Sequence, residues 1–345
     1  MASVNKIQEV TRNNQSVEVY ELKSDNGTTA VLTNYGGIIM KLIVKDKNGE
    51  ARDVVLGFDS VEDYWSEEYL KGYPYFGAMI GRYANRIKGA SFPLNGQTVH
   101  VTANKSGNIL HGGNEGFDQK VWKVVKTETD PVASITLQYV SADGEEGFPG
   151  ELTTTVTFVV KDNELVYEVE ASTNKTTVIN LAHHGYFNLD KNHSSVGQQK
   201  VKLNADYWLE QDEDFCVTGK LIPALNSNYD FSDWKTVSQE WNKEDGYDQT
   251  FVINRSNNDL ILAAEALSSD GTLHMQVYTT EPVVHLYTGK WIPVIKGKNG
   301  QQYQGYSAYC FETQHQPNAV NVPAFPSTVL NPGEKYSQAN SYRFV

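Results

Sequence analysis

The sequence predicts an all-β protein built from packed antiparallel sheets. Short stretches rich in Val, Ile, Leu, Thr and Tyr recur along the chain, and Gly, Asn and Asp separate them. Dipeptides typical of tight β-turns divide several neighbouring stretches. About twenty stretches qualify as strands, and no long amphipathic helical pattern interrupts them. A single all-β domain over residues 1–345 is therefore the expected architecture.

The first third of the chain predicts an antiparallel meander with one short helix. Asn48-Gly49 and Asn95-Gly96 each indicate a hairpin. The stretch from Ser60 to Leu70 predicts a helix, because Ser60 can cap its N-terminus and Asp63 follows three residues later. The expected strands are Val17–Leu22, Thr29–Asn34, Ile38–Val44, Val54–Phe58, Ala90–Phe92 and Thr98–Thr102.

The remainder of the chain continues the same pattern. Asp162-Asn163 indicates another hairpin. The stretch from Asn228 to Asn242 predicts a loop with at most one helical turn. The expected strands are Trp122–Thr127, Ser134–Val140, Glu151–Val160, Leu165–Ser172 and Val201–Leu209, with others near Phe251, Leu260, Leu273, Val283 and Tyr306.

Composition and charge argue against several classes of binding partner. Hydrophobic residues make up 39% of the chain, enough for a sizeable core. The formal net charge is -13 and no cluster of Lys and Arg occurs, so neither a nucleic-acid nor an anionic-membrane partner is expected. The N-terminus lacks the apolar core of a signal peptide, and no stretch approaches the ~20 apolar residues of a membrane span. Two distant cysteines, Cys216 and Cys310, predict reduced thiols and a cytoplasmic protein.

One stretch, NLAHHGYFNL from Asn180, places two histidines and a tyrosine inside an otherwise apolar run. If the run is a strand, alternation puts His184 and Tyr186 on one face and His183 on the other. One histidine is then expected to pack in the core while the other faces a different environment. Taken alone, a pair of core histidines bonded to the backbone is the more frequent arrangement.

Three other stretches place polar groups beside glycines or apolar runs. Arg82, Asn85 and Arg86 lie in GAMIGRYANRI, where an arginine meets either a carboxylate in a buried salt bridge or a polar ligand. His111 precedes two glycines, whose backbone freedom lets a ligand approach, although a surface turn is the alternative. Asp248 stands just before an apolar run, where an ordinary turn aspartate is the alternative.

The stretch YCFETQHQ carries a carboxylate in the middle of a predicted strand. Alternation places Cys310 and Glu312 on one face and Phe311 on the other. An unpaired carboxylate is costly to bury, so Glu312 is expected to meet a donor or to handle a proton. With reference pKa values of about 4.3 and about 6.5, Glu312 and His184 can form an acid/base pair, in which Asp248 could hold His184 protonated. The sequence therefore predicts a proton-transfer site.

Patterns for several other chemistries are missing from the sequence. It contains no nucleophile elbow, P-loop, dinucleotide fingerprint, HExxH or CxxC motif. The eight histidines have no partners at the spacings typical of metal ligands. Neither a cofactor nor a metal is therefore expected.

These stretches, in this order, resemble motifs of the galactose mutarotase (aldose 1-epimerase) family over essentially the whole chain. A series of so many motifs in one order is highly specific. The matching segments are DVVLGFDSVEDY from Asp53, PYFGAMIGRYANRI from Pro74, LHGGNEGFDQKVW from Leu110, DGEEGFPGEL from Asp143, NLAHHGYFNL from Asn180, GYDQTF from Gly246, FETQHQPNAVN from Phe311 and LNPGEKY from Leu330.

The resemblance implies a β-supersandwich of antiparallel sheets with few short helices. It also implies an isomerase that interconverts the α and β anomers of free aldoses such as galactose and glucose. His184 matches the family's general acid, which protonates the ring oxygen O5, and Glu312 matches the general base, which takes the proton of the C1 hydroxyl. The matching sugar-binding positions are Asn85, Arg86, His111 and Asp248, together with His285 at a sugar-contacting position and Tyr186 just beyond the acid.

The sequence departs from the family pattern at three positions. His183 stands where relatives often carry Asn, and His285 stands where many carry Gln. Gln316 replaces a frequent Trp and is expected to loosen the lip of the pocket. An imidazole differs from an amide in reach and charge, so these changes bear on sugar preference.

Three alternatives remain at this stage. One is a related epimerase or isomerase acting on another cyclic hemiacetal: a hexose phosphate, a pentose or a specialised metabolite. Another is a non-catalytic sugar-binding protein, against which the presence of both His184 and Glu312 argues. A glycosidase would want two carboxylates across the bond, and only Glu312 is well placed. The expected partner is thus a small-molecule aldose, bound by a monomer or weak homodimer.

Overall fold

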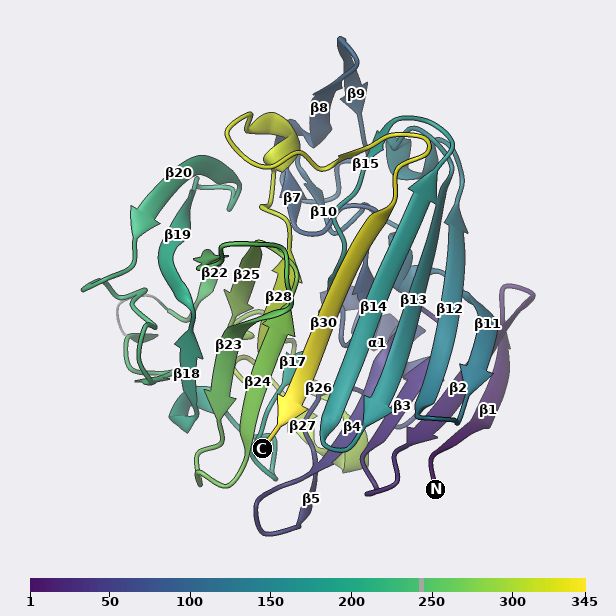
Figure 1. The fold of residues 1–345 in the computed structure, drawn as a ribbon, viewed down its shortest axis with the longest axis vertical. Helices are drawn as coiled ribbons and strands as arrows, with labels where there is room; N and C mark the ends of the chain where they lie inside the picture. Colours follow the sequence, from purple (N-terminus) through teal and green to yellow (C-terminus); the bar gives the residue numbers. More distant parts are fainter. Residues whose placement is uncertain (242–244) are drawn as a thin grey trace.

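The structure is a computed structural model that describes residues 1–241 and 245–345. Strands account for 47% of it and helices for 9%, which confirms the predicted all-β class. Three large antiparallel sheets form the body of the molecule, and five two-stranded ribbons connect or flank them. Figure 1 shows the largest sheet running across the whole molecule, with the N-terminal sheet packed behind one half of it.

The N-terminal sheet is the predicted meander, with one strand more than expected. In order across the sheet its strands are β1 (Ser3–Arg12), β2 (Gln15–Lys23), β3 (Thr29–Thr33), β4 (Ile39–Lys45) and β5 (Ala51–Asp53). The prediction missed β1, an edge strand whose charged side chains hide the alternation of its pattern. The second arm of the Asn48-Gly49 hairpin is β5 rather than Val54–Phe58, because Val55 instead makes an isolated bridge to Phe187.

The nine-stranded sheet contains the second predicted meander. Its spatial order is β11 (Lys123–Glu128), β12 (Ala133–Ser141), β13 (Leu152–Lys161), β14 (Glu164–Thr173), β30 (Tyr336–Phe344), β24 (His274–Thr279), β23 (Ile261–Leu267), β18 (Lys200–Leu203) and β21 (Lys235–Thr236). The Asp162-Asn163 hairpin joins β13 to β14 as predicted. The C-terminal strand β30 lies in the middle of the sheet, which closes the chain onto its own core (Figure 1).

The six-stranded sheet is assembled from distant parts of the chain. Its order is β17 (Tyr186–Phe187), β28 (Tyr309–Gln314), β25 (Val283–Tyr287), β22 (Asp248–Ile253), β19 (Ala205–Gln211) and β20 (Val217–Pro223). The expected single strand Val201–Leu209 is two strands in different sheets, β18 and β19. They are divided at Asn204, whose side chain donates to the carbonyls of Asn254 and Leu262.

The remaining strands form the two-stranded ribbons. They are β6 (Met79–Ile80) with β16 (Ala182–His183), β7 (Arg86–Ile87) with β10 (Ile109–Leu110), β8 (Ser91–Leu94) with β9 (Gln97–His100), β15 (Thr177–Val178) with β29 (Val329–Leu330), and β26 (Ile295–Lys296) with β27 (Gln302–Tyr303). The β8–β9 ribbon is the hairpin predicted at Asn95-Gly96 and projects from one end of the molecule (Figure 1).

The predicted helix from Ser60 to Leu70 is two shorter elements. A 3-10 turn, η1 (Val61–Trp65), is followed by the helix α1 (Glu67–Gly72). The Ser60 hydroxyl accepts the N–H of Glu62, so the capping pattern through Asp63 does not form. Ser66 breaks the segment because its extended backbone starts a second cap, in which its hydroxyl accepts the N–H of Tyr69.

The other short helical elements bounded within the described residues are single 3-10 turns. These turns are η2 (Lys88–Ala90), η3 (Phe117–Gln119), η4 (Glu145–Gly147), η5 (Val196–Gln198), η6 (Lys298–Gly300) and η7 (Ala319–Asn321). The predicted loop from Asn228 consists of turns and irregular backbone as far as Glu240, apart from β21, and Trp241 is helical, while Asn242 lies outside the described residues. Among the described residues, no helix has the length and apolar character that a membrane crossing requires.

Two hydrophobic cores lie on opposite faces of the six-stranded sheet. The main core fills the space between the nine-stranded sheet and the other two, and includes Leu32, Phe158 and Phe311. The second core packs the N-terminal sheet against η1 and α1, and includes Tyr69 and Cys310. Because side chains alternate along β28, Phe311 enters the main core while Cys310 points to the other side, as predicted.

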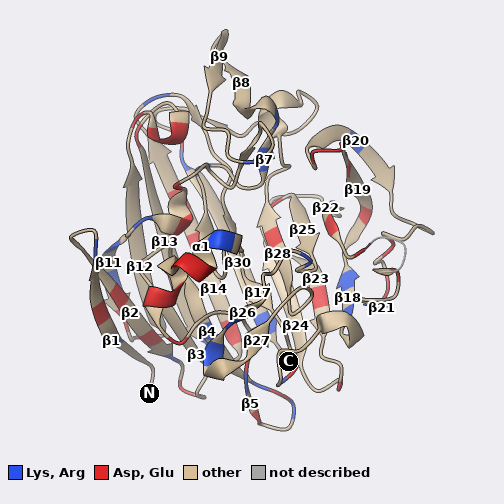
Figure 2. Cartoon of the chain, turned by 180° about the vertical axis from the view of Figure 1, so that it is seen from behind, with Lys and Arg blue, Asp and Glu red and all other residues tan. Residues whose placement is uncertain are grey.

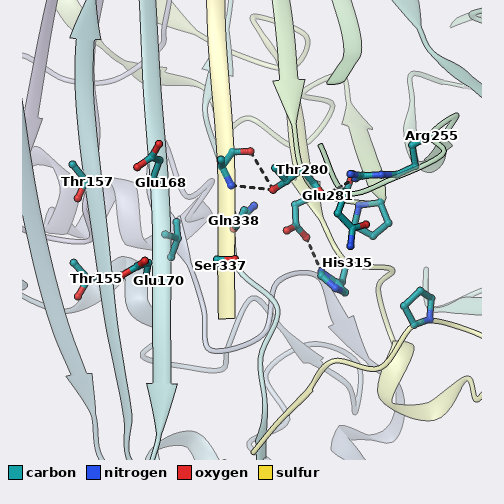
Figure 3. A pocket seen from close by; sticks show the side chains of 15 residues that line it. Thr155, Thr157, Glu168, Glu170, Arg255, Thr280, Glu281, His315, Ser337 and Gln338 are labelled. Atoms are coloured by element: carbon teal, nitrogen blue, oxygen red, sulfur yellow. Dashed lines mark hydrogen bonds and ion pairs between the residues drawn. The ribbon is translucent and has the colours of Figure 1, made fainter. Parts of the chain in front are cut away.

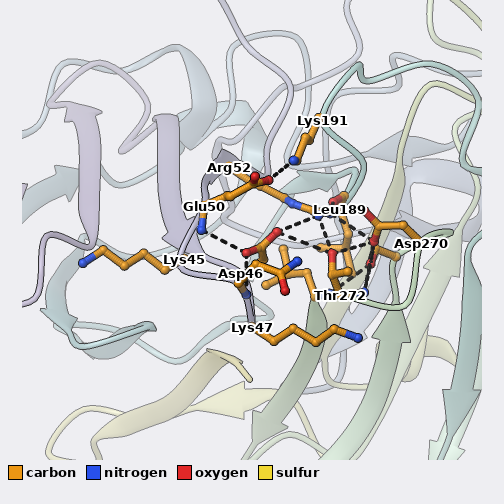
Figure 4. A network of polar contacts seen from close by, with 12 residues as sticks. Lys45, Asp46, Lys47, Glu50, Arg52, Leu189, Lys191, Asp270 and Thr272 are labelled. Carbon is orange, nitrogen blue, oxygen red and sulfur yellow. Dashed lines mark hydrogen bonds and ion pairs between the residues drawn. The ribbon is translucent and has the colours of Figure 1, made fainter.

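A buried arginine links three distant segments (Figure 4). Arg52 donates to Asp46 at 2.8 Å, to Asp270 at 2.7 Å and to the carbonyl of Leu189 at 3.0 Å. The side chains of Arg52 and Asp46 are 1% and 0% exposed. This network fixes the N-terminal sheet to the turn between β23 and β24 and to the end of β17. Lys and Arg are otherwise spread over many elements (Figure 2).

Lys298 is a second buried cation that joins distant segments. Its Nζ donates to Asp53 Oδ2 at 2.5 Å and to the carbonyls of Val55 and Met40 at 2.6 and 3.0 Å. These contacts tie η6 to the end of the N-terminal sheet. A charged donor satisfies two carbonyls there that water cannot reach.

The Lys298→Met substitution keeps the apolar stem and removes these three hydrogen bonds. We expect the free energy of unfolding, measured by urea denaturation, to fall by about 3 kcal/mol, because buried carbonyls lose a charged donor. Lys296→Met, two residues earlier and exposed on β26, is the control and should leave the unfolding midpoint unchanged. Equal midpoints for the two variants would contradict a structural role of Lys298.

Candidate active site

A cavity of about 590 Å³ opens on the side of the six-stranded sheet that faces away from the main core. All eight residues predicted as catalytic or sugar-binding line it: Asn85, Arg86, His111, His184, Tyr186, Asp248, His285 and Glu312. Three neighbouring strands, β22, β25 and β28, contribute Asp248, His285 and Glu312 in turn. Arg86 lies on β7, and Asn85 and His111 lie directly beside the ribbon of β7 and β10.

The histidine-rich stretch is two short strands rather than one. β16 pairs with β6, whereas β17 pairs with β28 in the six-stranded sheet. His184 lies at the crossing, where its N–H donates to the carbonyl of Ala78 and its carbonyl accepts the N–H of Gly77. The next residue, Gly185, lacks a Cβ that would come within 3.1 Å of the His183 ring. The glycine therefore permits the close turn that separates the two histidines.

The two histidines face opposite environments, as alternation predicted. His183 turns to the main core, where its Nε2 lies 2.9 Å from the Gly77 carbonyl and Tyr342 contacts its Nδ1. Burial lowers the pKa of His183 to about 3. His184 points into the cavity instead. His183 thus contributes to packing and does not line the cavity.

The imidazole of His184 is held between two tyrosine rings. Tyr186 stacks on it at a centroid distance of 4.9 Å and an interplanar angle of 17°, and Tyr75 stacks at 5.8 Å and 19°. Its Nδ1 lies 3.5 Å from the Sγ atom of Cys310. Burial lowers the pKa of His184, although the charge of Glu312 opposes this effect. Burial thus favours the neutral ring, and Glu312 is the adjacent carboxylate that favours the protonated ring.

Glu312 lies beside His184 at the floor of the cavity. The Oε1 atom of Glu312 is 3.6 Å from Nε2 of His184, and both side chains are at least 96% buried. Within the described part of the chain, Oε2 of Glu312 has no hydrogen-bond partner. A buried carboxylate oxygen without a protein donor is rare, so it is suited to accept a hydrogen bond or a proton from a ligand.

His111 is fixed in one tautomer by the backbone of Asn85. The N–H of Asn85 donates to Nδ1 of His111 at 3.2 Å, and the N–H of His111 donates to the carbonyl of Asn85 at 3.0 Å. Burial holds the pKa of His111 well below its usual value, so the ring is neutral. Its proton must then lie on Nε2, which makes His111 a hydrogen-bond donor toward the cavity.

Asp248 pairs with His285 and not with His184, which corrects one expectation. Asp248 Oδ1 lies 2.8 Å from His285 Nε2, and Thr250 Oγ1 lies 2.8 Å from His285 Nδ1. The antiparallel pairing of β22 with β25 puts the Asp248–His285 contact within reach. Burial favours a neutral His285, but Asp248 and Glu312 outweigh it and raise the pKa of His285. The pair is therefore an ion pair below that pKa.

Arg86 and Arg82 lie in different environments. Arg86 lies at the cavity wall with its guanidinium 5.3 Å from the centre of the Phe215 ring. Arg82 turns away, and its hydrogen bonds go to the carbonyls of Ser141, Ala142, Pro149 and Gly150 and to the Ser141 hydroxyl. Arg82 thus holds the loop before β13 in place. The sequence had predicted either a buried salt bridge or a polar ligand for this arginine, and within the described part of the chain Arg82 has neither.

The sequence did not reveal the aromatic part of the cavity. Tyr75, Phe215, Tyr287 and Trp291 line it, and Trp291 is 62% exposed at its mouth. No periodicity marks these residues, because they lie on loops or strand ends that the fold brings together. Gln316, expected at the lip, does not line the cavity, because it is buried beyond the end of β28.

One ligand atom each from His111, His184 and Glu312 lies within 4.8 Å of the other two, a grouping that could suggest a metal. The contact of Asn85 with His111 argues against it. His111 must accept at Nδ1 and carry its proton on Nε2, so its cavity-facing nitrogen has no free lone pair. The arrangement suits hydrogen bonding and proton transfer better than metal binding.

A separate hollow lies on the outer face of the nine-stranded sheet (Figure 3). It shares no lining residue with the cavity described above. Its deepest carboxylate, Glu281, is already paired with Nδ1 of His315 at 2.7 Å, and Arg255 donates to the carbonyls of Thr280 and Glu281. Because Glu281 is paired with His315 and Arg255 is bonded to backbone carbonyls, this hollow offers less for chemistry than the cavity.

Comparison with known proteins places these features in a family. The sequence pattern of the aldose 1-epimerase family matches residues 18–343. The chain is 38% identical to the galactose mutarotase of Homo sapiens over 337 residues, which cover 95% of this chain and 94% of that protein. It is 30% identical to the aldose 1-epimerase of Escherichia coli (strain K12), over 96% of both chains.

Solved structures agree with this result. The aldose epimerase homologue from C. elegans superposes with a TM-score of 0.86 at 30% identity, covering 95% of this chain and 99% of that chain. The galactose 1-epimerase from Lactobacillus acidophilus NCFM also gives a TM-score of 0.86, at 25% identity, and covers 100% of this chain and 99% of that chain. The fold is therefore that of the galactose mutarotase-like β-supersandwich proteins.

The chain belongs to the aldose 1-epimerase family, which confirms the resemblance seen in its motifs. It is accordingly an isomerase that interconverts the anomers of aldoses. The predicted fold class is confirmed as well.

Replacing Asp248 with Asn removes the carboxylate that keeps the proton on His285. The NMR titration midpoint of His285 should then fall below 6.5, because burial is left as the larger effect. In the unmodified protein folding raises the pKa of His285, so protonation of His285 stabilises the folded state. This contribution is complete below pH 6.5 and is lost as the pH rises through the pKa of the folded state. Asp214→Asn, also at the cavity, is the control and should not move the midpoint. A midpoint that stays above 6.5 in Asp248→Asn would refute the ion pair.

Proposed function

We propose that the cavity is the active site for anomer interconversion of free aldoses such as galactose and glucose. In this proposal His184 is the general acid and Glu312 is the general base. The single observation that supports it best is their placement side by side, 3.6 Å apart and almost fully buried. The ring oxygen and the anomeric hydroxyl of an aldose are bonded to the same carbon, so a proton donor and a proton acceptor must be neighbours to serve both.

The proposed reaction needs only these two groups and the sugar. Glu312 takes the proton of the C1 hydroxyl while His184, in its imidazolium form, gives its Nε2 proton to O5. The C1–O5 bond breaks to leave the aldehyde, and His184 is left as neutral imidazole. Rotation about the C1–C2 bond exposes either face of the carbonyl. When O5 attacks C1 again, each proton returns to its origin, and the new ring is the α or the β anomer. No electrons are gained or lost, so the reaction requires no redox cofactor.

The other predicted residues surround this pair with hydrogen-bonding groups. His111 presents an Nε2–H donor, and Arg86 presents a guanidinium at the wall. Asp248 accepts from His285 and keeps further acceptor capacity for sugar hydroxyls. We assign Asn85, Arg86, His111, Asp248 and His285 to hydroxyl binding. Tyr186 holds the His184 ring by stacking.

The charge of the cavity favours a neutral sugar over a hexose phosphate. Three cationic side chains, Lys71, Arg86 and Lys105, line it. Three carboxylates, Glu213, Asp214 and Glu312, balance them once Asp248 is paired with His285. Because the guanidinium of Arg82 is hydrogen-bonded to loop carbonyls, the cavity has no excess of positive charge with which to bind a phosphate dianion.

We further propose that the protein works as a single-domain monomer or weak homodimer in the cytoplasm, bound to no nucleic acid or membrane. The two cysteines, Cys216 and Cys310, are both free and buried, which fits a reducing compartment.

The experiment that tests the proposal is polarimetry on freshly dissolved α-D-galactose and α-D-glucose. We expect Glu312→Gln to lower the rate of equilibration by about 10²–10⁴, the usual contribution of one proton-transfer group, and His184→Gln to do the same. Glu281→Gln is the matched control, since Glu281 is also a 2% exposed glutamate but lies outside the cavity. It should retain the native rate. Loss of activity in Glu281→Gln alone would place the site elsewhere.

A further inference from the structure

The proposed reaction needs the imidazolium form of His184 at a place where a charge is costly. The side chain of His184 is 4% exposed, and burial lowers its pKa. A charged ring that is removed from water needs neighbouring groups that favour its charge. The cavity must therefore supply this compensation, and it must do so without occupying the Nε2 proton that the sugar receives.

Charged and titratable groups face His184 from several elements. Glu312, 3.6 Å away, and Asp248 favour the protonated ring, and the backbone carbonyl of His184 itself acts in the same direction. His285 opposes them, because it is positively charged when it is paired with Asp248. The other titratable neighbours are the thiol of Cys310 at 3.5 Å, the rings of His111 and Tyr287 in edge contact at 5.2 and 6.4 Å, and the two stacked tyrosines, Tyr75 and Tyr186.

The two stacked tyrosines cover the faces of the imidazole. The ring centre of Tyr186 lies 4.9 Å from that of His184 at an interplanar angle of 17°, and the ring centre of Tyr75 lies 5.8 Å away at 19°. The face of an aromatic ring is negative, so it attracts a cation that lies within about 6 Å of its centre. Because both tyrosine rings are nearly parallel to the imidazole, they leave its in-plane N–H groups free for Glu312 and the sugar.

Tyr75 reaches its place through an uncommon backbone conformation. It follows Pro74 just after α1, and its φ of 60° is a left-handed value that bulky residues rarely adopt. The ring of Tyr73 packs edge-on against it at a centroid distance of 4.6 Å, and the Tyr73 hydroxyl donates to the buried carboxylate of Asp118 at 2.5 Å. A strained conformation persists only where its surroundings hold it. The contact of Tyr73 with Asp118 is such a support for the Tyr75 ring.

We propose that Tyr75 is a positioning residue whose ring, together with that of Tyr186, stabilises the imidazolium form of His184 and so maintains the general acid. This inference rests on the proposed role of His184. An aromatic face suits this task because it carries no formal charge, whereas a further carboxylate beside the ring would compete with the sugar for the Nε2 proton. The stabilisation acts on one protonation state, so it sets the pH range in which the acid is available.

The direct test is an NMR titration of the His184 ring nitrogens, assigned from the loss of their signals in His184→Gln. Tyr75→Leu keeps an apolar side chain and removes the aromatic face. We expect it to lower the titration midpoint of His184 by about one pH unit, the size of one cation–π contact in a site shielded from water. Tyr75→Phe keeps the face and should keep the native midpoint. An unchanged midpoint in Tyr75→Leu would overturn the proposal.

Tyr278→Leu is the matched control for this titration. Tyr278 is also a partly buried tyrosine with a cation over its ring, since the guanidinium of Arg343 lies 5.0 Å from the ring centre, but it does not line the cavity. Its replacement should leave the His184 midpoint at the native value.

A series of fluorinated rings keeps the proposal testable if Tyr75→Leu does not fold. The ring that Tyr75→Phe introduces can carry increasing numbers of fluorine atoms, which weaken its negative face and change its shape little. The midpoint of His184 should then fall with each added fluorine. A midpoint that stays constant across the series would refute the role of the ring face.

The pH dependence of aldose equilibration tests the link to the reaction. Because the imidazolium is the acid, the rate should fall as the pH rises through the pKa of His184. In Tyr75→Leu we expect this fall about one pH unit lower, so that the rate is about tenfold below the native rate at neutral pH and approaches it toward acid pH. A structural defect alone would lower the rate equally at every pH, and that outcome would contradict the proposal.

The titration and the kinetics also separate this inference from the proposed function. If the native protein equilibrates no aldose, the proposed function fails, yet the NMR midpoints still show whether the Tyr75 ring stabilises the imidazolium. If the native protein is active and the His184 midpoint does not depend on Tyr75, the proposed function stands and the role of Tyr75 falls.

Discussion

The structure of the cavity depends on a carboxylate buried in the middle of a strand. A strand in the interior of a sheet presents alternate residues to opposite faces, so β28 can send Phe311 into the main core and Glu312 to the other side without leaving the sheet. Removing a charged group from water costs several kcal/mol unless nearby groups compensate. His184 lies 3.6 Å from one oxygen of Glu312, and the other oxygen has no hydrogen-bond partner among the described residues, so a donor on a ligand can complete the compensation.

The same loss of water affects each histidine in the cavity differently. Burial lowers the pKa of His111 and of His184, and at His184 the nearby carboxylate of Glu312 works against this effect. His285 has Asp248 at 2.8 Å, and its pKa rises. Three imidazoles that line one cavity thus differ in pKa because each has a different partner. The neutral ring of His111 serves as a directional donor, whereas the charged ring of His285 keeps Asp248 ionised.

His285 shows how a charged imidazole is accommodated in the cavity wall. The carboxylate of Asp248 on the neighbouring strand balances its charge. The hydroxyl of Thr250 contacts the second ring nitrogen, so both nitrogens are satisfied. The imidazole therefore shapes the electrostatics of the cavity wall without a ring nitrogen left unpaired.

The sequence by itself determined the all-β class, most strand positions, and the opposite facing of His183 and His184, because these follow from local alternation. It also supplied the cavity residues, although only through motifs whose order is shared with a known family. It could not show that Asp248 partners His285, that Arg82 serves a loop, or that Tyr75 covers His184. Those contacts join segments that lie far apart in the sequence, so no local pattern predicts them. Only the packing of the three sheets decides which segments come into contact.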